Sequence, residues 1–192
     1  MAPTLLISLP LFFFFFLFLN LSPAKTYQTS SKCISPKELG LKQEKLTHIH
    51  FYFHDVIRGQ NPTAIQILKA KLPNTSSIGF GFTVMVDNPL TVGPEQSSKL
   101  VGKAQGLYAS ASQTEIGLLM VFNLVFTQGK YKGSTLSLLG RNVILSKVRE
   151  MPIVGGTGLF RFARGYAQAR TYMFNMTSGN AIVEYNVYVF HY

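Results

Sequence analysis

The chain has 192 residues and a formal net charge of +10 at pH 7, from 18 lysines and arginines against 8 aspartates and glutamates. This length fits one domain with a hydrophobic core, and the single cysteine excludes an internal disulfide. The cations are scattered without a Lys/Arg run or a recognisable binding motif, so we expect no nucleic-acid partner.

The first 24 residues form a segment of their own. Residues 5–21 are almost wholly apolar, and Ser22-Pro23-Ala24 supplies small residues of the kind that a signal peptidase prefers. A membrane anchor needs about 20 apolar residues, whereas this run is slightly shorter and is interrupted by a proline and an asparagine. We therefore predict a cleaved secretory signal over residues 1–24 rather than an anchor, and an extracellular mature protein without membrane contact.

The segment that follows, residues 25–45, is of lower complexity, and we expect a loose N-terminal arm. It contains Cys33, which is either free or paired between two chains. We expect a buried thiol that takes no part in chemistry.

From the end of the arm onward, the pattern is that of strands and not of helices. Residues 47–56 place Ile49, Phe51, Phe53 and Asp55 on one face. Further apolar or alternating runs cover residues 79–86, 100–109, 117–127, 135–145, 160–171 and 181–192. Turn signals separate the runs, at Asn88-Pro89, Gly93-Pro94, residues 129–133, Gly155-Gly156 and residues 178–180. The glycine pair begins a tight turn over residues 155–158, which we expect between two strands. This pattern predicts one all-β domain over residues 46–192, an antiparallel barrel or sandwich of seven or eight strands.

Two aspartates lie on strand patterns with apolar neighbours. Asp55 shares its face with Phe53, so it lies either at an exposed strand end or inside a cavity. Inside a cavity, burial would raise its pKa and make it a proton donor near neutral pH. Asp87 shares its face with Thr83 and Met85, but it also precedes the predicted turn, where Asp is common because of its local hydrogen bonds. The pattern leaves both alternatives open.

Asn74 and Asn175 each begin a sequon, and we predict glycosylation of both on surface loops. The four histidines and the cysteine lack the spacing of metal ligands, so we predict no metal site. His48, His50 and His54 alternate along one strand face, which is typical of solvated or hydrogen-bonded side chains.

Five segments of the chain resemble the plant dirigent family, in order and in spacing. They are residues 50–55 (HFYFHD), 86–91 (VDNPLT), 102–108 (GKAQGLY), 140–142 (GRN) and 154–167. The resemblance implies an eight-stranded antiparallel β-barrel of the dirigent and allene oxide cyclase type, with an apolar central pocket. It also implies secretion to the apoplast and a homo-oligomer, either a dimer or a trimer.

Lignan-forming dirigent proteins bind phenoxy radicals that a separate oxidase, a laccase or peroxidase, supplies, and they guide stereoselective coupling without oxidising the substrate. By this resemblance no cofactor is needed. Six pocket residues are implied: catalytic Asp55, Asp87 and Arg149, and substrate-binding Tyr108, Asn142 and Phe53. The two aspartates would exchange protons with a quinone methide, Tyr108 would hydrogen-bond a phenol, and Arg149 would stabilise phenolate charge.

The chain also departs from the lignan-forming pattern. Asn142 and Leu159 stand where lignan-forming relatives tend to have Asp. Residues 149–152 (REMP), 160–167 (FRFARGYA) and 184–189 (EYNVYV) resemble the branch that includes legume pterocarpan synthases. Those enzymes dehydrate a 4-hydroxyisoflavan and close a ring through a quinone methide. We therefore expect stereocontrol of radical coupling in phenylpropanoid metabolism, with dehydration as the alternative.

A third possibility is a basic cell-wall binding protein of plant defence, in which the barrel is only a scaffold. The charge of +10 suits polyanions such as pectin. The same charge is equally expected of a protein that needs it only for solubility.

Overall fold

The computed structural model describes residues 30–69 and 79–192, which contain nine strands and two short 3-10 helices. The strands are β1 (Lys45–Asp55), β2 (Ala64–Leu68), β3 (Thr83–Thr91), β4 (Leu100–Ser110), β5 (Gly117–Phe126), β6 (Thr135–Val143), β7 (Arg149–Thr157), β8 (Arg164–Phe174) and β9 (Ala181–His191). The helices are η1 (Gly129–Tyr131) and η2 (Gly158–Phe160). Over these two ranges, no helix has the length and apolar character to cross a membrane. The predicted signal and the Asn74 sequon lie outside the described residues.

The chain divides into two units, Met1–Gly40 and Leu41–Tyr192. In the described part of the first unit, every residue is exposed. Ser35 and Glu38 form a local turn, in which the backbone N–H of Ser35 donates to Glu38 Oε2 at 2.6 Å. Cys33 is exposed, so the expectation of a buried thiol is wrong; nothing in this segment forms a core around it.

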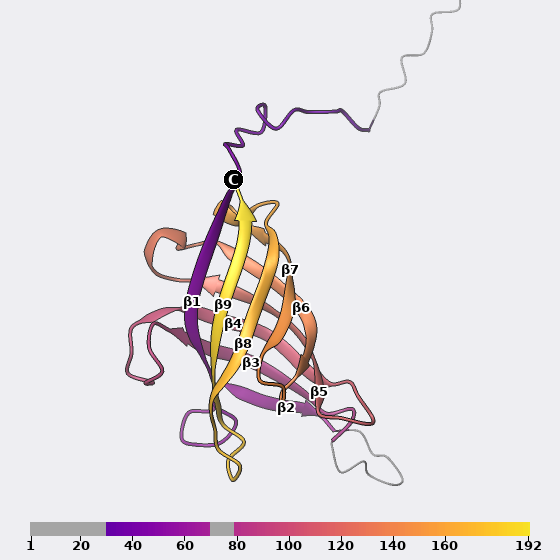
Figure 1. Ribbon diagram of the computed structural model, residues 1–192, viewed down its shortest axis with the longest axis vertical. Helices are drawn as coiled ribbons and strands as arrows, with labels where there is room; N and C mark the ends of the chain where they lie inside the picture. Colours follow the sequence, from indigo (N-terminus) through magenta and orange to yellow (C-terminus); the bar gives the residue numbers. More distant parts are fainter. Residues whose placement is uncertain (1–29, 70–78) are drawn as a thin grey trace, which may run out of the picture. The chain divides into compact units, whose positions relative to one another are not determined.

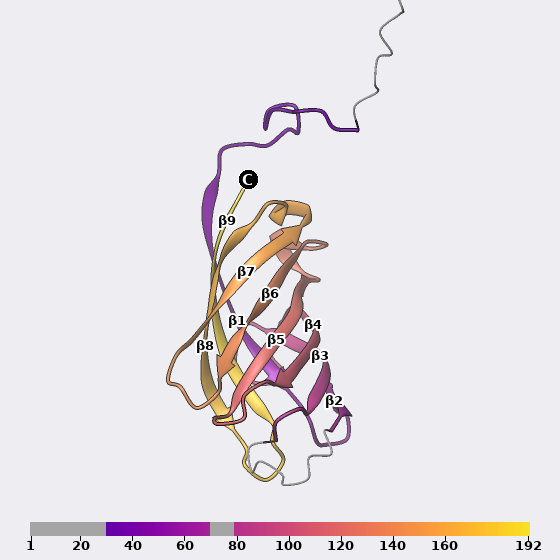
Figure 2. The same ribbon diagram turned by 90° about the vertical axis from the view of Figure 1, so that its right-hand side faces the viewer.

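The second unit is a closed barrel. Its strands follow the order β1-β9-β8-β7-β6-β5-β4-β3-β2, every pair is antiparallel, and β1 also pairs with β3 through Phe53 and Leu90. The first and last strands therefore lie side by side, in indigo and yellow in Figure 1. Figure 2 shows the same barrel with β5, β6 and β7 toward the viewer. The short strand β2 is an addition on β3, so the predicted eight-stranded antiparallel barrel is confirmed.

One end of the barrel interior is filled with aromatic side chains. Phe160 is fully buried, and its ring centroid lies 4.7 Å from that of Tyr131, 4.9 Å from that of His191 and 5.5 Å from that of Phe126. His191 is held by Leu159, whose carbonyl oxygen lies 2.8 Å from Nδ1. Close packing of this kind leaves no room for a ligand between these rings.

The turn predicted at Asn88-Pro89 is strand in the structure, because both residues lie inside β3. At this point β3 changes its neighbour. Val86 pairs with Ala64 at the start of β2, whereas Leu90 pairs with Phe53 of β1. A residue without a backbone N–H is tolerated where the ladder changes partner, and strand β2 itself is absent from the predicted runs.

The turn predicted over residues 155–158 forms only at the end of that range, since β7 continues to Thr157. A Cβ at Gly156 would lie 2.5 Å from the carbonyl oxygen of Thr135, so glycine permits a close approach of two backbones. The chain turns at Gly158, the first residue of η2, whose φ is 62°.

Candidate functional site

The end of the barrel opposite the aromatic cluster holds a cavity of about 540 Å³. It lies where β1 ends and β9 begins, with the small side chains of Thr171, Ala181 and Val183 in its wall. The larger apolar side chains around it are Phe53, Phe82, Leu118, Met120, Ile144 and Phe174. The ionisable or amide side chains around it are Asp55, Tyr108, Asn142, Lys147, Arg149 and Tyr185.

Asp55 is the last residue of β1 and lies on its inner face with Phe53. Its Oδ1 accepts a hydrogen bond from Asn88 Nδ2 at 3.0 Å, and its Oδ2 accepts one from the Tyr108 hydroxyl at 3.0 Å. Burial raises the pKa of Asp55, and the two hydrogen bonds offset this rise only in part. The structure therefore places this carboxyl group in the cavity and not at an exposed strand end.

Tyr108 comes from β4 and is buried. Burial raises the pKa of its hydroxyl, and the negative charge of Asp55 raises it further. The hydroxyl group therefore stays protonated across the physiological pH range. Because a tyrosine hydroxyl can both donate and accept, Tyr108 can relay a proton between Asp55 and a bound ligand.

Arg149 opens β7 and is 5% exposed. Its Nε donates to Asn142 Oδ1 at 3.1 Å, and its Nη1 donates to the carbonyl oxygen of Ser146 at 3.4 Å. Burial lowers the pKa of the guanidinium, which the nearby Tyr185 partly offsets. No carboxylate in residues 30–69 and 79–192 pairs with Arg149. A buried cation with neutral partners suits an anionic oxygen of a ligand.

Asn142 reaches the cavity from β6 and is also buried. Its Oδ1 is used by Arg149, and its Nδ2 lies 3.6 Å from Met120 Sδ, which is a weak acceptor. The amide of Asn142 therefore positions the guanidinium and leaves its charge uncompensated. A carboxylate at this position would neutralise that charge.

The aromatic wall of the cavity is centred on Phe53. Its ring centroid lies 5.7 Å from that of Tyr185 and 5.9 Å from that of Phe122. Tyr185 is 1% exposed, and its hydroxyl has no hydrogen-bond partner within the described part of the chain. Burial raises the pKa of this hydroxyl, with the charge of Arg149 acting in the opposite direction. Sequence patterning gave no signal for Tyr185 as a site residue.

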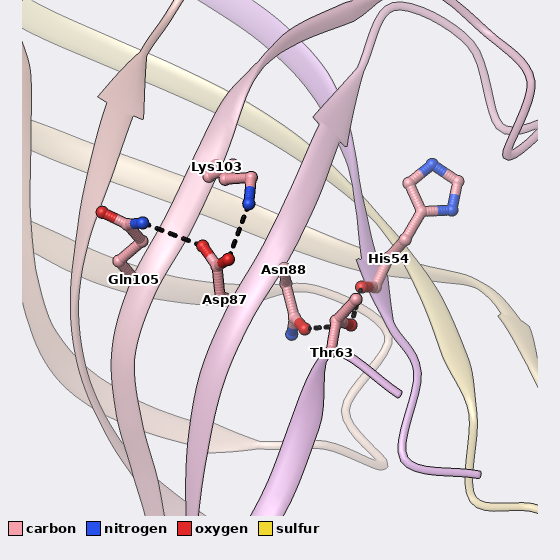
Figure 3. A network of polar contacts seen from close by, with 6 residues as sticks. All are labelled: His54, Thr63, Asp87, Asn88, Lys103 and Gln105. Carbon is pink, nitrogen blue, oxygen red and sulfur yellow. Dashed lines mark hydrogen bonds and ion pairs between the residues drawn. The ribbon is translucent and has the colours of Figure 1, made fainter. Parts of the chain in front are cut away.

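Asp87 does not line the cavity, so the expectation that it is a pocket residue is wrong. It lies outside the barrel, where Lys103 Nζ donates to it at 2.6 Å and Gln105 Nε2 at 2.9 Å (Figure 3). Its side chain is 52% exposed, and the hydrogen bond from Lys103, followed by that from Gln105, lowers its pKa. Asp87 does share a face with Met85 as predicted, but that face is the outer one.

The inner neighbour of Asp87 is Asn88, which is completely buried and absent from the predicted site. Its amide donates to Asp55 and accepts from Thr63 Oγ1 at 2.6 Å (Figure 3). The signal for it lies in the alternation of β3, because Val84, Val86, Asn88 and Leu90 are the buried positions.

The histidines of β1 make separate contacts on its other face. His48 bonds with Asn186 Oδ1 at 2.8 Å, His50 with Glu184 Oε1 at 2.9 Å, and the buried His54 with Thr91 Oγ1 at 2.6 Å. Over residues 30–69 and 79–192, no three His, Cys, Asp or Glu side chains lie together as metal ligands would. Asn175 is exposed between β8 and β9, so its predicted glycosylation stays a prediction.

Comparison with known proteins places these features in a family. The family model for dirigent-like proteins matches residues 46–190. Dirigent protein 21 of Arabidopsis thaliana is 55% identical over 97% of this chain and 97% of its own length. Pterocarpan synthase 1 of Glycyrrhiza echinata is 54% identical over 98% of this chain and 97% of its own. A solved structure of a pterocarpan synthase dirigent protein is 55% identical, covers 84% of this chain and 99% of its own, and superposes with a TM-score of 0.77. The chain therefore belongs to the dirigent family.

Proposed function

We propose that this protein uses the barrel cavity to remove water from a 4-hydroxyisoflavan and to close the ring of a pterocarpan through a quinone methide. The observation that carries the proposal is the hydrogen-bonded pair of Asp55 and Tyr108 in the apolar cavity. In this pair a carboxyl group with a raised pKa accepts a hydrogen bond from a neutral phenol. The similarity to pterocarpan synthases of Glycyrrhiza echinata and Glycine max, each 54% identical, supports it.

The reaction requires the protein to donate one proton to the substrate and to accept one proton from it. Loss of water breaks the bond between carbon 4 and its hydroxyl oxygen, and the leaving oxygen takes up a proton. Ring closure joins the same carbon to a phenolic oxygen, which releases a proton. Among the described lining residues Asp55 is the only carboxyl group, so the Asp55–Tyr108 pair both supplies the first proton and receives the second. The pair ends in its starting state, and no oxidant is consumed.

Arg149 acts on the phenolic oxygen of the substrate whose electrons move toward carbon 4 in this step. As the hydroxyl leaves, the ionised phenolic oxygen conjugated to carbon 4 becomes the carbonyl of the quinone methide, and ring closure restores its charge. A fixed buried cation stabilises the ionised phenol from which the reaction starts and to which it returns. The amide of Asn142 keeps Arg149 in place while leaving its charge available to the substrate.

The test is an incubation of the purified secreted form with racemic 4-hydroxyisoflavan in the absence of any oxidant, followed by chiral chromatography. The proposal predicts that one enantiomer is consumed faster and that a pterocarpan forms. If neither enantiomer is consumed, the proposal is wrong.

Stereocontrol of phenoxy-radical coupling toward lignan-type products is the second candidate function. Dirigent protein 21, at 55% identity, supports it, as do the aromatic side chains of Phe53, Phe82 and Tyr108 in the cavity lining. Incubation with a monolignol and a laccase tests it. This function predicts that the handedness of the coupled product changes only when oxidase and protein are both present.

We also propose that the protein acts in the apoplast and carries a glycan on Asn175. The exposed position of this residue between β8 and β9 supports the second point. A decrease in mass after endoglycosidase treatment of the plant-secreted protein, smaller in Asn175→Gln than in the wild type by the mass of one glycan, is the expected result; equal decreases in both proteins would contradict it.

A further inference from the structure

The amide of Asn88 has a fixed orientation. Thr63 Oγ1 accepts a hydrogen bond from the backbone N–H of Val56 at 3.3 Å, and its own proton is directed at Asn88 Oδ1, 2.6 Å away, in preference to the carbonyl oxygen of His54, 3.5 Å away (Figure 3). Because Oδ1 of Asn88 faces this donor, Nδ2 must face Asp55. A flipped amide would set its oxygen against a carboxylate oxygen and its NH₂ group against the Thr63 hydroxyl.

Thr63 is itself held in place by the backbone. Its N–H donates to the carbonyl oxygen of Val56 at 2.8 Å, and its carbonyl oxygen accepts from the N–H of Asp87 at 2.9 Å. A chain of hydrogen bonds therefore runs from Thr63 through Asn88 to Asp55 in the cavity. In each of these bonds the backbone contacts of Thr63 determine which group donates and which accepts.

The two oxygens of Asp55 consequently differ. Oδ1 faces an NH₂ group, which has no acceptor capacity, so a proton on Oδ1 would meet another hydrogen. Oδ2 faces the Tyr108 hydroxyl, which can turn from donor to acceptor. A protonated Asp55 can then donate to the Tyr108 oxygen and turn the Tyr108 hydrogen toward the cavity.

We propose that Thr63 and Asn88 are positioning residues that confine the exchangeable proton of Asp55 to Oδ2, so that Tyr108, backed by Asp55, is the group that hands the proton to the leaving oxygen of the substrate. The second half of this statement rests on the proposed dehydration. The first half concerns the protein alone and is tested without substrate.

The protonation of Asp55 can be followed by NMR, because Asp55 and Asp87 are the only aspartates in the chain. Protein labelled with carbon-13 at the aspartate carboxyl gives two signals, one from inside the cavity and one from outside the barrel. The other titratable or charged side chains in the cavity lining are Tyr108, Lys147, Arg149 and Tyr185, and no histidine is among the described lining residues. His54, the residue before Asp55 in β1, lies outside the lining, and burial lowers its pKa, so the Cε1–H signal of His54 is followed in the same titration. A transition of the inner signal that the His54 signal does not share belongs to Asp55.

The comparison is between Thr63→Val, which keeps the shape of the side chain and removes the hydroxyl, and Thr63→Ser, which keeps the hydroxyl. In Thr63→Val the Asn88 amide is no longer held as a donor, so the titration midpoint of Asp55 moves to higher pH while that of Asp87 stays. Thr63→Ser restores the midpoint of the wild type. Asn88→Ala, which removes the donor itself, gives the same upward movement and serves if Thr63→Val does not fold. An unchanged Asp55 midpoint in the variants, or equal movement in the valine and serine variants, overturns the positioning role.

The role of Tyr108 in handing the proton to the substrate is tested by the kinetics of Tyr108→Phe, which leaves Asp55 in place. It should lose turnover about as severely as Asp55→Asn, by about 10²-fold or more, while the Asp55 signal still titrates. Thr63→Val should lower kcat by about tenfold, the worth of one hydrogen bond to a charged group, with KM nearly unchanged. Retained turnover in Tyr108→Phe overturns the delivery step. If the wild type shows no dehydration at all, the proposed function fails, yet the titrations still decide whether Thr63 and Asn88 control the Asp55 proton.

Discussion

Asp87 and Asn88 are consecutive residues of β3 whose side chains lie on opposite sides of the barrel wall. The carboxylate of Asp87 bonds with Lys103 outside, whereas the amide of Asn88 donates to Asp55 inside. This alternation leaves Asp55 as the only carboxyl group among the described cavity residues. In the proposed reaction, the roles of acid and base therefore fall on Asp55 alone, and Asp87 is the matched control residue outside the barrel.

The stability of the protein should depend on pH through Asp55. Burial raises the folded-state pKa of this group above its ordinary value of 3.8, so the folded state binds the proton more tightly than the unfolded state. The resulting stabilisation is fully present below about pH 4 and is lost as pH rises through the folded-state pKa. Asp55→Asn should remove this loss. Urea unfolding of wild type and variant at pH 4 and pH 7.5 measures it, and an equal pH dependence in both proteins would contradict the effect.

Asn142→Asp should weaken the binding of phenolic anions. A carboxylate beside Arg149 Nε, where the amide oxygen now lies 3.1 Å away, would pair with the guanidinium and neutralise it. We expect the Kd of an ionised phenolic ligand to rise about tenfold, equivalent to about 1.4 kcal/mol. Asn123→Asp on the exposed side of β5 makes the same charge change outside the cavity and should leave the Kd unchanged. Titration calorimetry compares the two; equal weakening in both would mean a general effect of charge.

Phe53→Leu should reduce enantioselectivity more than turnover. The Phe53 ring forms a wall of the cavity, so a smaller side chain gives the substrate more than one orientation. Loss of about 1.4 kcal/mol of discrimination lowers the ratio of enantiomers tenfold. Phe160→Leu removes a similar volume from the packed end, away from the cavity, and should destabilise the fold while keeping the ratio. Chiral chromatography with both variants tests this; a lower ratio in Phe160→Leu as well would argue against local control by Phe53.

The glycine pair near the end of β7 should respond unequally to alanine. At Gly156 a Cβ would lie 2.5 Å from the Thr135 carbonyl oxygen and 2.7 Å from Phe160, so we expect a loss of about 1–3 kcal/mol in the free energy of unfolding. At Gly155 nothing lies within 4 Å of the added atom, so that variant should be as stable as the wild type or slightly more stable. Thermal unfolding distinguishes them, and equal melting temperatures would show that β7 relaxes around the methyl group.

The barrel was predictable because strand alternation is a local property of the sequence. The run that contains Phe51, Phe53 and Asp55 matches β1 almost residue for residue, and Asp55 is on the inner face because its neighbours there are aromatic. The same local rule finds which residues of β3 share a face. It does not state which face is inside, so the pattern left the position of Asp87 open. The family resemblance put Asp87 in the pocket, whereas the structure places Asn88 on the inner face beside Asp55.

The remaining errors have non-local causes. Pro89 is tolerated in β3 because the neighbouring strand changes from β2 to β1 at that point, which only the closed barrel reveals. Gly156 lies within β7 instead of in a turn, and a glycine is required there because Thr135 of the neighbouring strand and Phe160 leave no room for a Cβ. Tyr185 lies in the stretch 184–189, but nothing in that stretch indicates that its side chain lines the cavity, and Thr63 lies in no motif. The role of each depends on the residues that the closed barrel places beside it.

The most direct test of the account compares Asp55→Asn with Asp87→Asn in the conversion of racemic 4-hydroxyisoflavan without oxidant. Both variants replace one carboxyl group by an amide, one inside the cavity and one outside the barrel. We predict that Asp55→Asn stays folded and loses turnover by about 10²–10⁴-fold, whereas Asp87→Asn keeps the rate and enantioselectivity of the wild type. Equal rates in the wild type and a folded Asp55→Asn variant would contradict the central claim that Asp55 carries the proton for this chemistry.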